Sequence, residues 1–221
     1  MISLSKRLKT VADLVLSKES NKIIDVGCDH ALLDIYLIQN NENLKVVASD
    51  NKKAPLENAR KNIEKYSFLN KIELKLEDGI NNIDDEIDTI VISGMGKETI
   101  IDILKKGNLN NIKRLIISSN NKFEDIRKDI TSLGFIINDE KIVYEEDKYY
   151  VIIEFIKGNK KYTKKELYFG PILLKKKDKK FYNYYGYIKD KKISILKSIP
   201  SDNKNKKKIE KEIEILKEIE V

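Results

Sequence analysis

The sequence predicts an α/β fold with a mostly parallel seven-stranded sheet, a final antiparallel hairpin and a small helical pair at the end of the chain. Three observations support this prediction. Short runs of β-type residues alternate with helical patterns over the first 157 residues. The last two β-type runs are joined by only a few residues, and helical spacing alone continues beyond them.

The elements follow one another in a regular order. A first helix is expected over residues 3–16, where Leu4, Leu8, Val11 and Val15 recur at helical spacing. The β-type runs cover residues 22–27, 44–50, 71–76, 87–94, 113–119, 135–145 and 148–156. Helical patterns lie between them at about residues 31–39, 54–66, 97–105 and 123–133. Strands that alternate with crossover helices form βαβ units, which predicts a sheet covered on both faces.

The final pair of strands differs from the others. Residues 135–145 and 148–156 are connected through the acidic sequence "EEDK", which is too short for a parallel crossover. We therefore expect these strands to form an antiparallel hairpin.

The chain changes character after residue 157, and we expect two domains, 1–157 and 158–221. The polar "GNKKYT" marks the break, and the Gly-Pro of "YFGPILL" is expected to interrupt regular structure. One helix is expected from Phe181 to Pro200, and apolar residues at spacings of three and four predict a second up to Ile219. With the turn Pro200–Ser201–Asp202, they would form a helical hairpin.

Charge is unevenly distributed along the chain. The formal net charge is +7, but residues 158–221 hold 19 Lys against 9 acidic residues, a net +10, which leaves −3 for residues 1–157. A basic tail indicates a polyanionic partner, because neutralising phosphates releases condensed counterions. A solvated lysine-rich face, or a general compositional bias toward lysine, would produce the same pattern.

Several classes of protein are disfavoured by composition. No apolar run is long enough to span a membrane and the first residues lack the features of a secretory signal, so a cytoplasmic protein is expected. The single cysteine, Cys28, excludes an internal disulfide, and with one histidine there are too few ligands for a structural zinc site. We expect no metal and a monomer.

The stretch "DVGCDHALLD" after the first strand predicts a nucleotide-binding turn but lacks the glycines of a dinucleotide fingerprint. That fingerprint would place glycines at Gly27, Asp29 and Leu32, and only the first is present. A carboxylate at the second position would repel a pyrophosphate, which disfavours NAD. S-adenosylmethionine removes the conflict, because it has no phosphate and carries a sulfonium cation.

Other candidate residues follow the ends of successive strands. Asp25 ends the first strand, Asp50 the second, Asp78 follows the third and Gly94 the fourth. Open α/β sheets bind ligands at the carboxyl ends of their strands. Asp50 lies 23 residues after Gly27, about where an acid that binds ribose hydroxyls is expected. Solvated acids or helix caps remain the alternative for each acid taken alone.

At these motifs the chain resembles a known family. "LSKRLKTVADLV", "DVGCDHALLD", "LEDGI", "ISGMGKETIIDIL" and "FGPILL" are similar to the bacterial TrmK family, S-adenosylmethionine-dependent methyltransferases that modify N1 of adenine-22 in tRNA. The resemblance covers almost the whole chain. It implies a class I methyltransferase, Rossmann-like sheet, to which the expected antiparallel final hairpin also points.

The resemblance also implies roles for individual residues. The cofactor would be bound by Asp25, Gly27, Asp50, Asp78, Gly79 and Gly94. Asp29 would be catalytic, near the transferred methyl group, although it could instead be the N-cap of the following helix. The substrate would contact His30, Met95, Asn120 and Arg7. A histidine bonded to the backbone of the first turn is the alternative for His30. Arg7 would reach an RNA phosphate or the methionine carboxylate, and a solvated side chain is the alternative. In the basic tail, Lys175, Lys176 and Lys177 are candidates for contact with tRNA phosphates.

The chain departs from the family pattern at three places. Asp34 stands where the family tends to have proline, Lys97 stands where a second glycine would follow "GMG", and Ser118 and Ser119 stand where Gln-Pro precedes the asparagine. These departures affect the expectation for the substrate more than that for the cofactor.

Other functions remain open on the sequence alone. The chain could methylate another RNA, a small molecule or a protein, or it could be a non-catalytic RNA-binding protein. A nicotinamide-dependent oxidoreductase is the least favoured alternative, because of Asp29.

Overall fold

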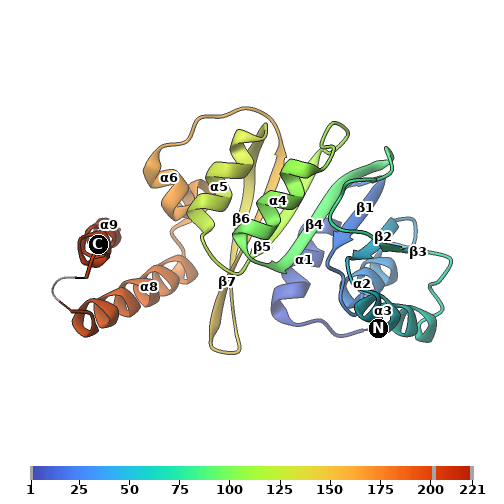
Figure 1. Ribbon diagram of the computed structural model, residues 1–221, viewed down its shortest axis with the longest axis horizontal. Coiled ribbons are helices and arrows are strands. Elements are labelled where there is room, and N and C mark those ends of the chain that lie inside the picture. The colour runs from blue at the N-terminus through green and yellow to red at the C-terminus, as the bar shows by residue number, and fades with distance from the viewer. Residues whose placement is uncertain (1, 201–202, 220–221) are drawn as a thin grey trace. The chain divides into compact units, whose positions relative to one another are not determined.

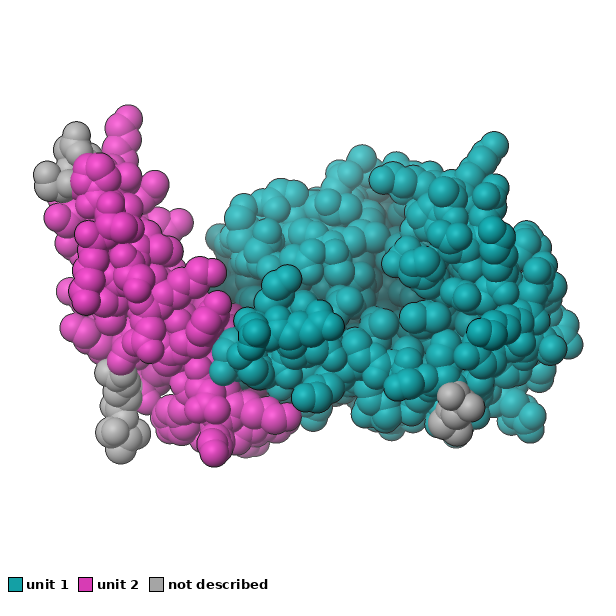
Figure 2. Space-filling view, turned by 90° about the horizontal axis from the view of Figure 1, so that it is seen from below, with its two compact units in different colours: residues 1–172 teal, residues 173–221 magenta. Residues whose placement is uncertain are grey.

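The computed structural model describes residues 2–200 and 203–219 and divides the chain into two compact units, Met1–Ile172 and Leu173–Val221 (Figure 2). The first unit contains one seven-stranded sheet in the order β3-β2-β1-β4-β5-β7-β6 (Figure 1). The strands are β1 (Lys22–Val26), β2 (Lys45–Asp50), β3 (Ile72–Leu76), β4 (Ile87–Met95), β5 (Arg114–Ser119), β6 (Phe135–Glu145) and β7 (Lys148–Lys157). The first five pair in parallel, and β7 pairs antiparallel with both β5 and β6, which confirms the predicted fold class.

Helices cover both faces of the sheet. Helices α4 and α5 lie on one face, and α1, α2 and α3 on the other (Figure 1). The bounds are α1 (Lys6–Leu16), α2 (Leu32–Asn40), α3 (Lys53–Lys65), α4 (Lys97–Lys106) and α5 (Phe123–Ser132). The alternating sequence pattern thus placed each element within a few residues. The core is built of aliphatic side chains, since β1, β4 and β5 are buried along almost their whole lengths.

The hairpin between β6 and β7 has the tight turn that its sequence predicts. Glu145 pairs with Lys148, so only Glu146 and Asp147 lie in the loop. Both have positive φ angles, 48° and 57°, as in the two-residue turn whose twist matches that of antiparallel strands. The Glu145 carboxylate accepts hydrogen bonds from the backbone N–H groups of Lys6 and Arg7, so the hairpin holds the first turn of α1.

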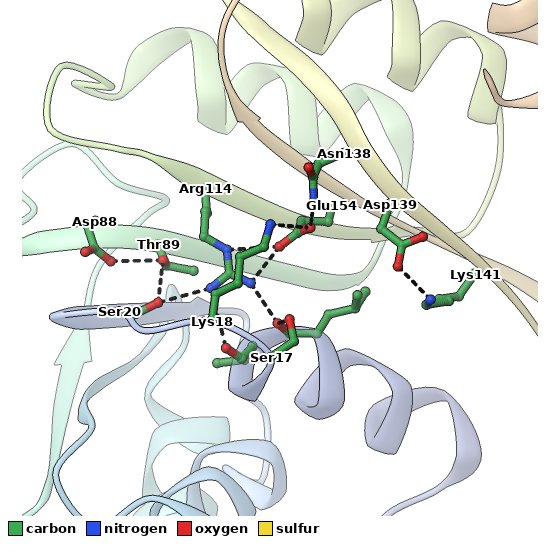
Figure 3. A network of polar contacts seen from close by, with 12 residues as sticks. Ser17, Lys18, Ser20, Asp88, Thr89, Arg114, Asn138, Asp139, Lys141 and Glu154 are labelled. Atoms are coloured by element: carbon green, nitrogen blue, oxygen red, sulfur yellow. Dashed lines mark hydrogen bonds and ion pairs between the residues drawn. The ribbon is translucent and has the colours of Figure 1, made fainter. Parts of the chain in front are cut away.

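The other end of α1 is held by a buried ionic network (Figure 3). Arg114 donates to the carbonyl oxygens of Leu14 and Val15 and to the Glu154 carboxylate, at 2.7 Å from its Nη2. Lys18 also contacts Glu154, at 3.1 Å. Helix α1 is therefore fixed at both ends. This determines where its side chains, including Arg7, lie relative to the carboxyl ends of the strands.

The "YFGPILL" segment is helical, contrary to the expectation of an irregular segment. Helix α6 (Lys164–Phe169) precedes Gly170, and α7 (Pro171–Lys176) follows it. Thr163 and Glu166 form a reciprocal capping box at the start of α6. Proline is favoured in the first turn of a helix, so Pro171 begins a helix instead of interrupting one.

A fully buried ion pair holds α6 within the first unit. Arg127 Nε lies 2.7 Å from Glu140 Oε1, and both side chains are completely buried. Arg127 also donates to the carbonyl oxygens of Leu167 and Tyr168 at the end of α6. Gly170 has a φ of 84°, and a Cβ there would lie 2.5 Å from the Glu140 carboxylate, which explains the glycine. The first unit thus continues past residue 157 to Ile172.

The second unit contains α8 (Lys179–Ser198) and α9 (Lys206–Lys217), which contact each other. Asp178 caps α8 by accepting a hydrogen bond from Phe181 N. The rings of Phe181 and Tyr185 lie 4.9 Å apart, and both are buried. Of the expected turn between the two helices, Ser201 and Asp202 lie outside the described residues. Within the described part of the chain, no helix is long and apolar enough to cross a membrane.

Candidate functional site

A cavity of about 480 Å³ opens at the carboxyl ends of β1, β2 and β4. Its size lies in the range of small-molecule sites, and its position is where open α/β sheets bind ligands. Eight residues singled out in the sequence line it together: Arg7, Asp25, Gly27, Asp29, His30, Asp50, Gly94 and Met95. Residues far apart in the chain, from α1 to the end of β4, therefore meet in one place.

Gly27 is favoured by the left-handed backbone conformation at the end of β1. Its φ is 79°, and a Cβ at this position would lie 2.4 Å from the Cε of Met95. The N–H groups of Gly27 and Cys28 both donate to the carbonyl oxygen of Ser49, at 2.8 and 3.0 Å. The turn after β1 is thereby tied to β2 just before Asp50.

Asp29 does not cap α2, so the alternative interpretation of this residue is wrong. The N-cap position is Ala31, which has a φ of 53°, and no side chain caps this helix. Asp29 itself has a φ of 50°, and its side chain is 72% exposed on the cavity rim. Its Oδ1 lies 3.7 Å from Nε2 of His30. A carboxylate that does not serve the helix is available for chemistry at the cavity.

Two carboxyl groups are buried beneath this turn. Burial and, second, the charge of Asp50 raise the pKa of Asp25 to about 7. Asp34, in the first turn of α2, is completely buried, and neither of its carboxyl oxygens has a hydrogen-bond partner. Burial and then the charge of Asp25 raise its pKa well above the usual value. Burial, together with these acids, also raises the pKa of the Cys28 thiol, so it is not a reactive thiolate.

Arg7 supplies positive charge on the opposite wall. Its Nη1 donates to Ser93 Oγ at 3.1 Å, and its guanidinium lies 5.2 Å from the ring centre of Tyr150. A Cβ on Gly94 would lie 3.5 Å from the same Nη1, in ordinary contact. An anionic group of a ligand could therefore be bound at this end of the cavity, away from Asp50.

Comparisons with known proteins agree with this geometry. Residues 4–153 match the family model of a methyltransferase domain. Mycoplasma capricolum TrmK, solved with S-adenosylhomocysteine, is 31% identical and has a TM-score of 0.82, covering 97% of this chain and 96% of that one. The chain belongs to the TrmK family of methyltransferases.

Two further relatives show how far the similarity extends. The tRNA (adenine(22)-N(1))-methyltransferase of Bacillus subtilis is 29% identical over 99% of this chain and 97% of its own. A Streptococcus pneumoniae protein solved with S-adenosyl-L-methionine has a TM-score of 0.88 and 30% identity, with 99% of each chain covered. The similarity of TrmK proteins to this chain thus includes the tail.

Some of the residues singled out in the sequence do not line the cavity. Asp78 accepts a hydrogen bond of 3.4 Å from Asn51, which does line the cavity. Gly79 has a φ of 78° and packs against Ile103 of α4. Lys175 and Lys176 belong to α7, and Lys177 follows it.

Asn120 is oriented by the end of β4. Its Nδ2 donates to the Gly94 carbonyl at 2.7 Å and its backbone N–H to that of Met95 at 2.9 Å. The preceding residues, Ser118 and Ser119, are buried at the end of β5. The asparagine of the TrmK pattern is therefore held next to two cavity residues although Gln-Pro is absent.

Lys97, which stands where the family pattern has a glycine, is accommodated by contacts with neighbouring residues. The Lys97 Nζ lies 2.7 Å from Asp129 Oδ2 on α5, and this hydrogen bond raises the pKa of the lysine. Its backbone N–H donates to Asn121 Oδ1 at 3.2 Å. The ammonium group is therefore bound to α5.

Sequence reasoning missed several residues of the site. Ser93, Lys52, Leu8, Leu32 and Pro55 also line the cavity. Asn62 of α3 donates to the carbonyl oxygen of His30 at 2.9 Å. Nothing in residue type or spacing distinguishes Asn62 from other helix-surface asparagines, because its contact exists only in the folded chain. Among the described residues, no group of three or more His, Cys, Asp or Glu side chains could hold a metal ion.

Proposed function

We propose that this protein transfers a methyl group from S-adenosylmethionine to N1 of adenine 22 in tRNA. The single observation that carries the proposal is the acid-lined cavity at the carboxyl ends of β1, β2 and β4, with Asp29 on its rim. The Bacillus subtilis relative is named for this reaction, and its similarity extends over 99% of this chain. The proposal takes the protein to act as a monomer in the cytoplasm.

The residues present suit this cofactor. Both Asp50 and Asp25 line the cavity; Asp50 would accept hydrogen bonds from ribose hydroxyls, and Asp25 would suit a cationic group. Arg7 is the cation of the opposite wall and would bind the carboxylate of the methionine portion. Gly27 and Gly94 both have positive φ angles, 79° and 91°, which favour glycine at these two positions of the cavity wall. When bound, the cofactor supplies an electrophilic methyl group on a sulfonium.

The reaction requires little proton chemistry from the protein. Adenine N1 carries an in-plane lone pair at neutral pH, so no strong general base is needed. The task of the protein is to hold N1 in line with the methyl carbon and sulfur, an orientation effect worth up to roughly 7–11 kcal/mol. His30 and Met95 on the cavity wall and the adjacent Asn120 are proposed to hold the base.

Asp29 has a specific role in this scheme. Methylation at N1 makes the base cationic, and a carboxylate near the ring stabilises that charge as it develops. It could equally position N1 by accepting a hydrogen bond from the exocyclic amine. Either role requires the carboxylate to reach toward the substrate, which is consistent with its exposure and with its not capping α2.

The tRNA must also be bound outside the cavity. Adenine N1 lies on the pairing edge of the base, so a paired base must be extracted before it can react. We propose that Lys175, Lys176 and Lys177 contact tRNA phosphates. Replacing all three with Ala should weaken binding and reduce the slope of log K against log salt by up to about 2 to 3, with cofactor affinity unchanged.

A matched control separates a local contact from net charge. The triple variant Lys206→Ala, Lys207→Ala, Lys208→Ala makes the same change of charge at the start of α9. It should reduce the slope less than the first triple variant does. Equal slopes for the two variants would contradict a specific role for residues 175–177.

One experiment tests the proposed function directly. The full-length protein is incubated with methyl-labelled S-adenosylmethionine and unmodified tRNA, and the labelled base is mapped. We expect label at N1 of adenine 22. Label on another RNA position, a protein or a small molecule would support the alternative methyltransferases, whereas RNA binding without cofactor binding would indicate a non-catalytic protein.

A further inference from the structure

The turn that carries Asp29 has a backbone that ordinary residues seldom adopt. Asp29 and Ala31 both lie in the left-handed region, with φ angles of 50° and 53°. Such conformations persist only where surrounding contacts determine them. The contacts that hold this turn therefore also determine where the Asp29 carboxylate lies.

These contacts reach the turn from two sides. On one side, the N–H groups of Gly27 and Cys28 donate to Ser49 at the end of β2. On the other side, Asn62 Nδ2 of α3 donates to the carbonyl oxygen of His30 at 2.9 Å. The first pair of bonds ties down the cofactor side of the turn, before Asp29. The bond from Asn62 ties down the part that follows it.

Asn62 is well placed to act as a fixed donor. It lies in the third turn of α3, and the next residue, Ile63, is completely buried, which fixes this part of the helix. The His30 carbonyl precedes the N-cap residue Ala31 and so has no partner within α2. The side-chain amide from α3 supplies that partner.

We propose that Asn62 is a positioning residue for catalysis, which holds the turn of residues 28–31 so that Asp29 faces the target base. This inference rests on the proposed function for its kinetic consequence, but not for its structural one. It assigns to Asn62, which does not itself line the cavity, a part in setting the turnover rate.

The two contact sets predict a division of effects. Loss of the Asn62 bond frees the turn after Asp29, so turnover should fall. The bonds to Ser49 remain, so the cofactor side of the cavity should be little affected. A residue with a merely structural role would change stability without separating turnover from cofactor affinity.

The test uses near-isosteric variants of the full-length protein. Asn62→Asp keeps the shape of the side chain but replaces the amide donor with an acceptor, and Asn62→Ala removes the side chain without adding charge. Asn58→Asp, one turn earlier on α3 at an exposed position, makes the same change in charge as the control. Urea unfolding establishes that all three variants are folded.

Two measurements are made on each variant. Hydrogen exchange of residues 28–33 in the protein without tRNA should accelerate at least tenfold in both Asn62 variants and remain unchanged in Asn58→Asp. Turnover of tRNA should fall about tenfold in both Asn62 variants, whereas the calorimetric dissociation constant of S-adenosylmethionine should change less than threefold. Asn62→Gln, which keeps an amide donor, should recover part of the turnover.

The outcomes distinguish failure of this inference from failure of the proposed function. Unchanged exchange at residues 28–33 would overturn the inference whatever the substrate. Faster exchange with unchanged turnover on tRNA would also overturn it, because the turn would then not govern catalysis. If the wild-type protein methylates no tRNA, the proposed function fails, and the exchange measurement still decides whether Asn62 holds the turn.

Discussion

The first unit contains two pairs of buried carboxyl groups, and only one of the pairs is bonded to arginine. Glu140 and Glu154, each 1% exposed, are both bonded to an arginine at 2.7 Å. Asp25 and Asp34, 5% and 0% exposed, lie at the cavity end of the sheet without an arginine partner. The two groups are thus equally buried but differ in whether a cation accompanies them.

The pKa values follow this difference. Burial acts to raise the pKa of Glu154, but hydrogen bonds from Arg114, Asn138 and Lys18 outweigh it and hold the value below its usual range. Burial alone dominates for Asp25 and Asp34, and their pKa values rise. Where the fold must be held together, the acids are neutralised internally. At the cavity end of the sheet, the two acids form no ion pair within the described part of the chain.

Breaking the internal pairing should produce the largest effect. Arg127→Met would leave Glu140 buried without its partner, and we expect a loss of about 3–5 kcal/mol in the free energy of unfolding, measured in urea. The double variant Arg127→Met, Glu140→Leu should recover at least part of that loss, because no uncompensated charge remains. A single variant as stable as the wild type would show that the pair does not stabilise the fold.

Replacing Asp34, an acid of the other group, should instead raise the free energy of unfolding. Asp34 has a raised pKa, so the folded protein holds a proton that the unfolded chain releases above about pH 4. Stability is therefore lost as pH rises from there through the folded-state pKa, at up to about 1.4 kcal/mol per pH unit. Asp34→Asn removes this loss, and its advantage over the wild type should grow by up to about 2.7 kcal/mol between pH 5 and 7.

The measurement is urea unfolding at several pH values. Asp190→Asn, at an exposed position of α8, makes the same chemical change and should keep the pH dependence of the wild type. If Asp34→Asn and the wild type are equally stable at every pH, Asp34 is not a proton-binding buried carboxyl.

The same contrast explains what the sequence could and could not predict. The strands and helices repeat with local periodicity, so their order and the antiparallel hairpin follow from residue patterns. Gly27 and Asp29 could be recognised from spacing within one turn. The pairing of Arg127 with Glu140 could not, because the two residues meet only once α5 and β6 have packed. Helices α6 and α7 were not expected for the same reason. The glycine between them, Gly170, suggested a break in regular structure, whereas it is needed because a Cβ there would meet the carboxylate of the buried pair.

Asp34 shows the limit most clearly. In the sequence it is an acid in the first turn of a helix, a position that ordinarily lies in water and stabilises the helix dipole. In the structure this turn faces the core, and both oxygens are without a partner. The direction in which a side chain points depends on how α2 packs on the sheet, which no local pattern specifies.

Substitution of Asp29 tests the role of the exposed acid on the cavity rim. Asp29→Asn should lower turnover on tRNA about ten- to one-hundredfold, equivalent to about 1.4–2.7 kcal/mol, because the carboxylate charge is lost while the shape is retained. Calorimetry should find the affinity for S-adenosylmethionine within a few-fold of the wild type. Asp13→Asn, on α1 with a side chain 56% exposed, is the control and should leave turnover unchanged. Normal turnover in Asp29→Asn would refute the role of Asp29.

The smallest expected effect is the pH dependence of the affinity for the cationic cofactor. The pKa of Asp25 is raised to about 7, so the carboxyl group is mostly neutral at pH 6 and mostly ionised at pH 8. The sulfonium of S-adenosylmethionine is a cation at both pH values, so the compound should bind about tenfold more tightly at pH 8 than at pH 6, equivalent to about 1.4 kcal/mol. Adenosine carries no such cation, and its affinity should not rise.

Calorimetry in buffers of different ionisation enthalpy counts the proton that Asp25 releases on binding. The measurement is repeated in His30→Gln, which lacks the imidazole on the rim. Asp50 is the other acid whose charge acts on Asp25. An affinity for S-adenosylmethionine that is independent of pH, with no proton released, would show that Asp25 does not supply the negative charge that the cofactor meets.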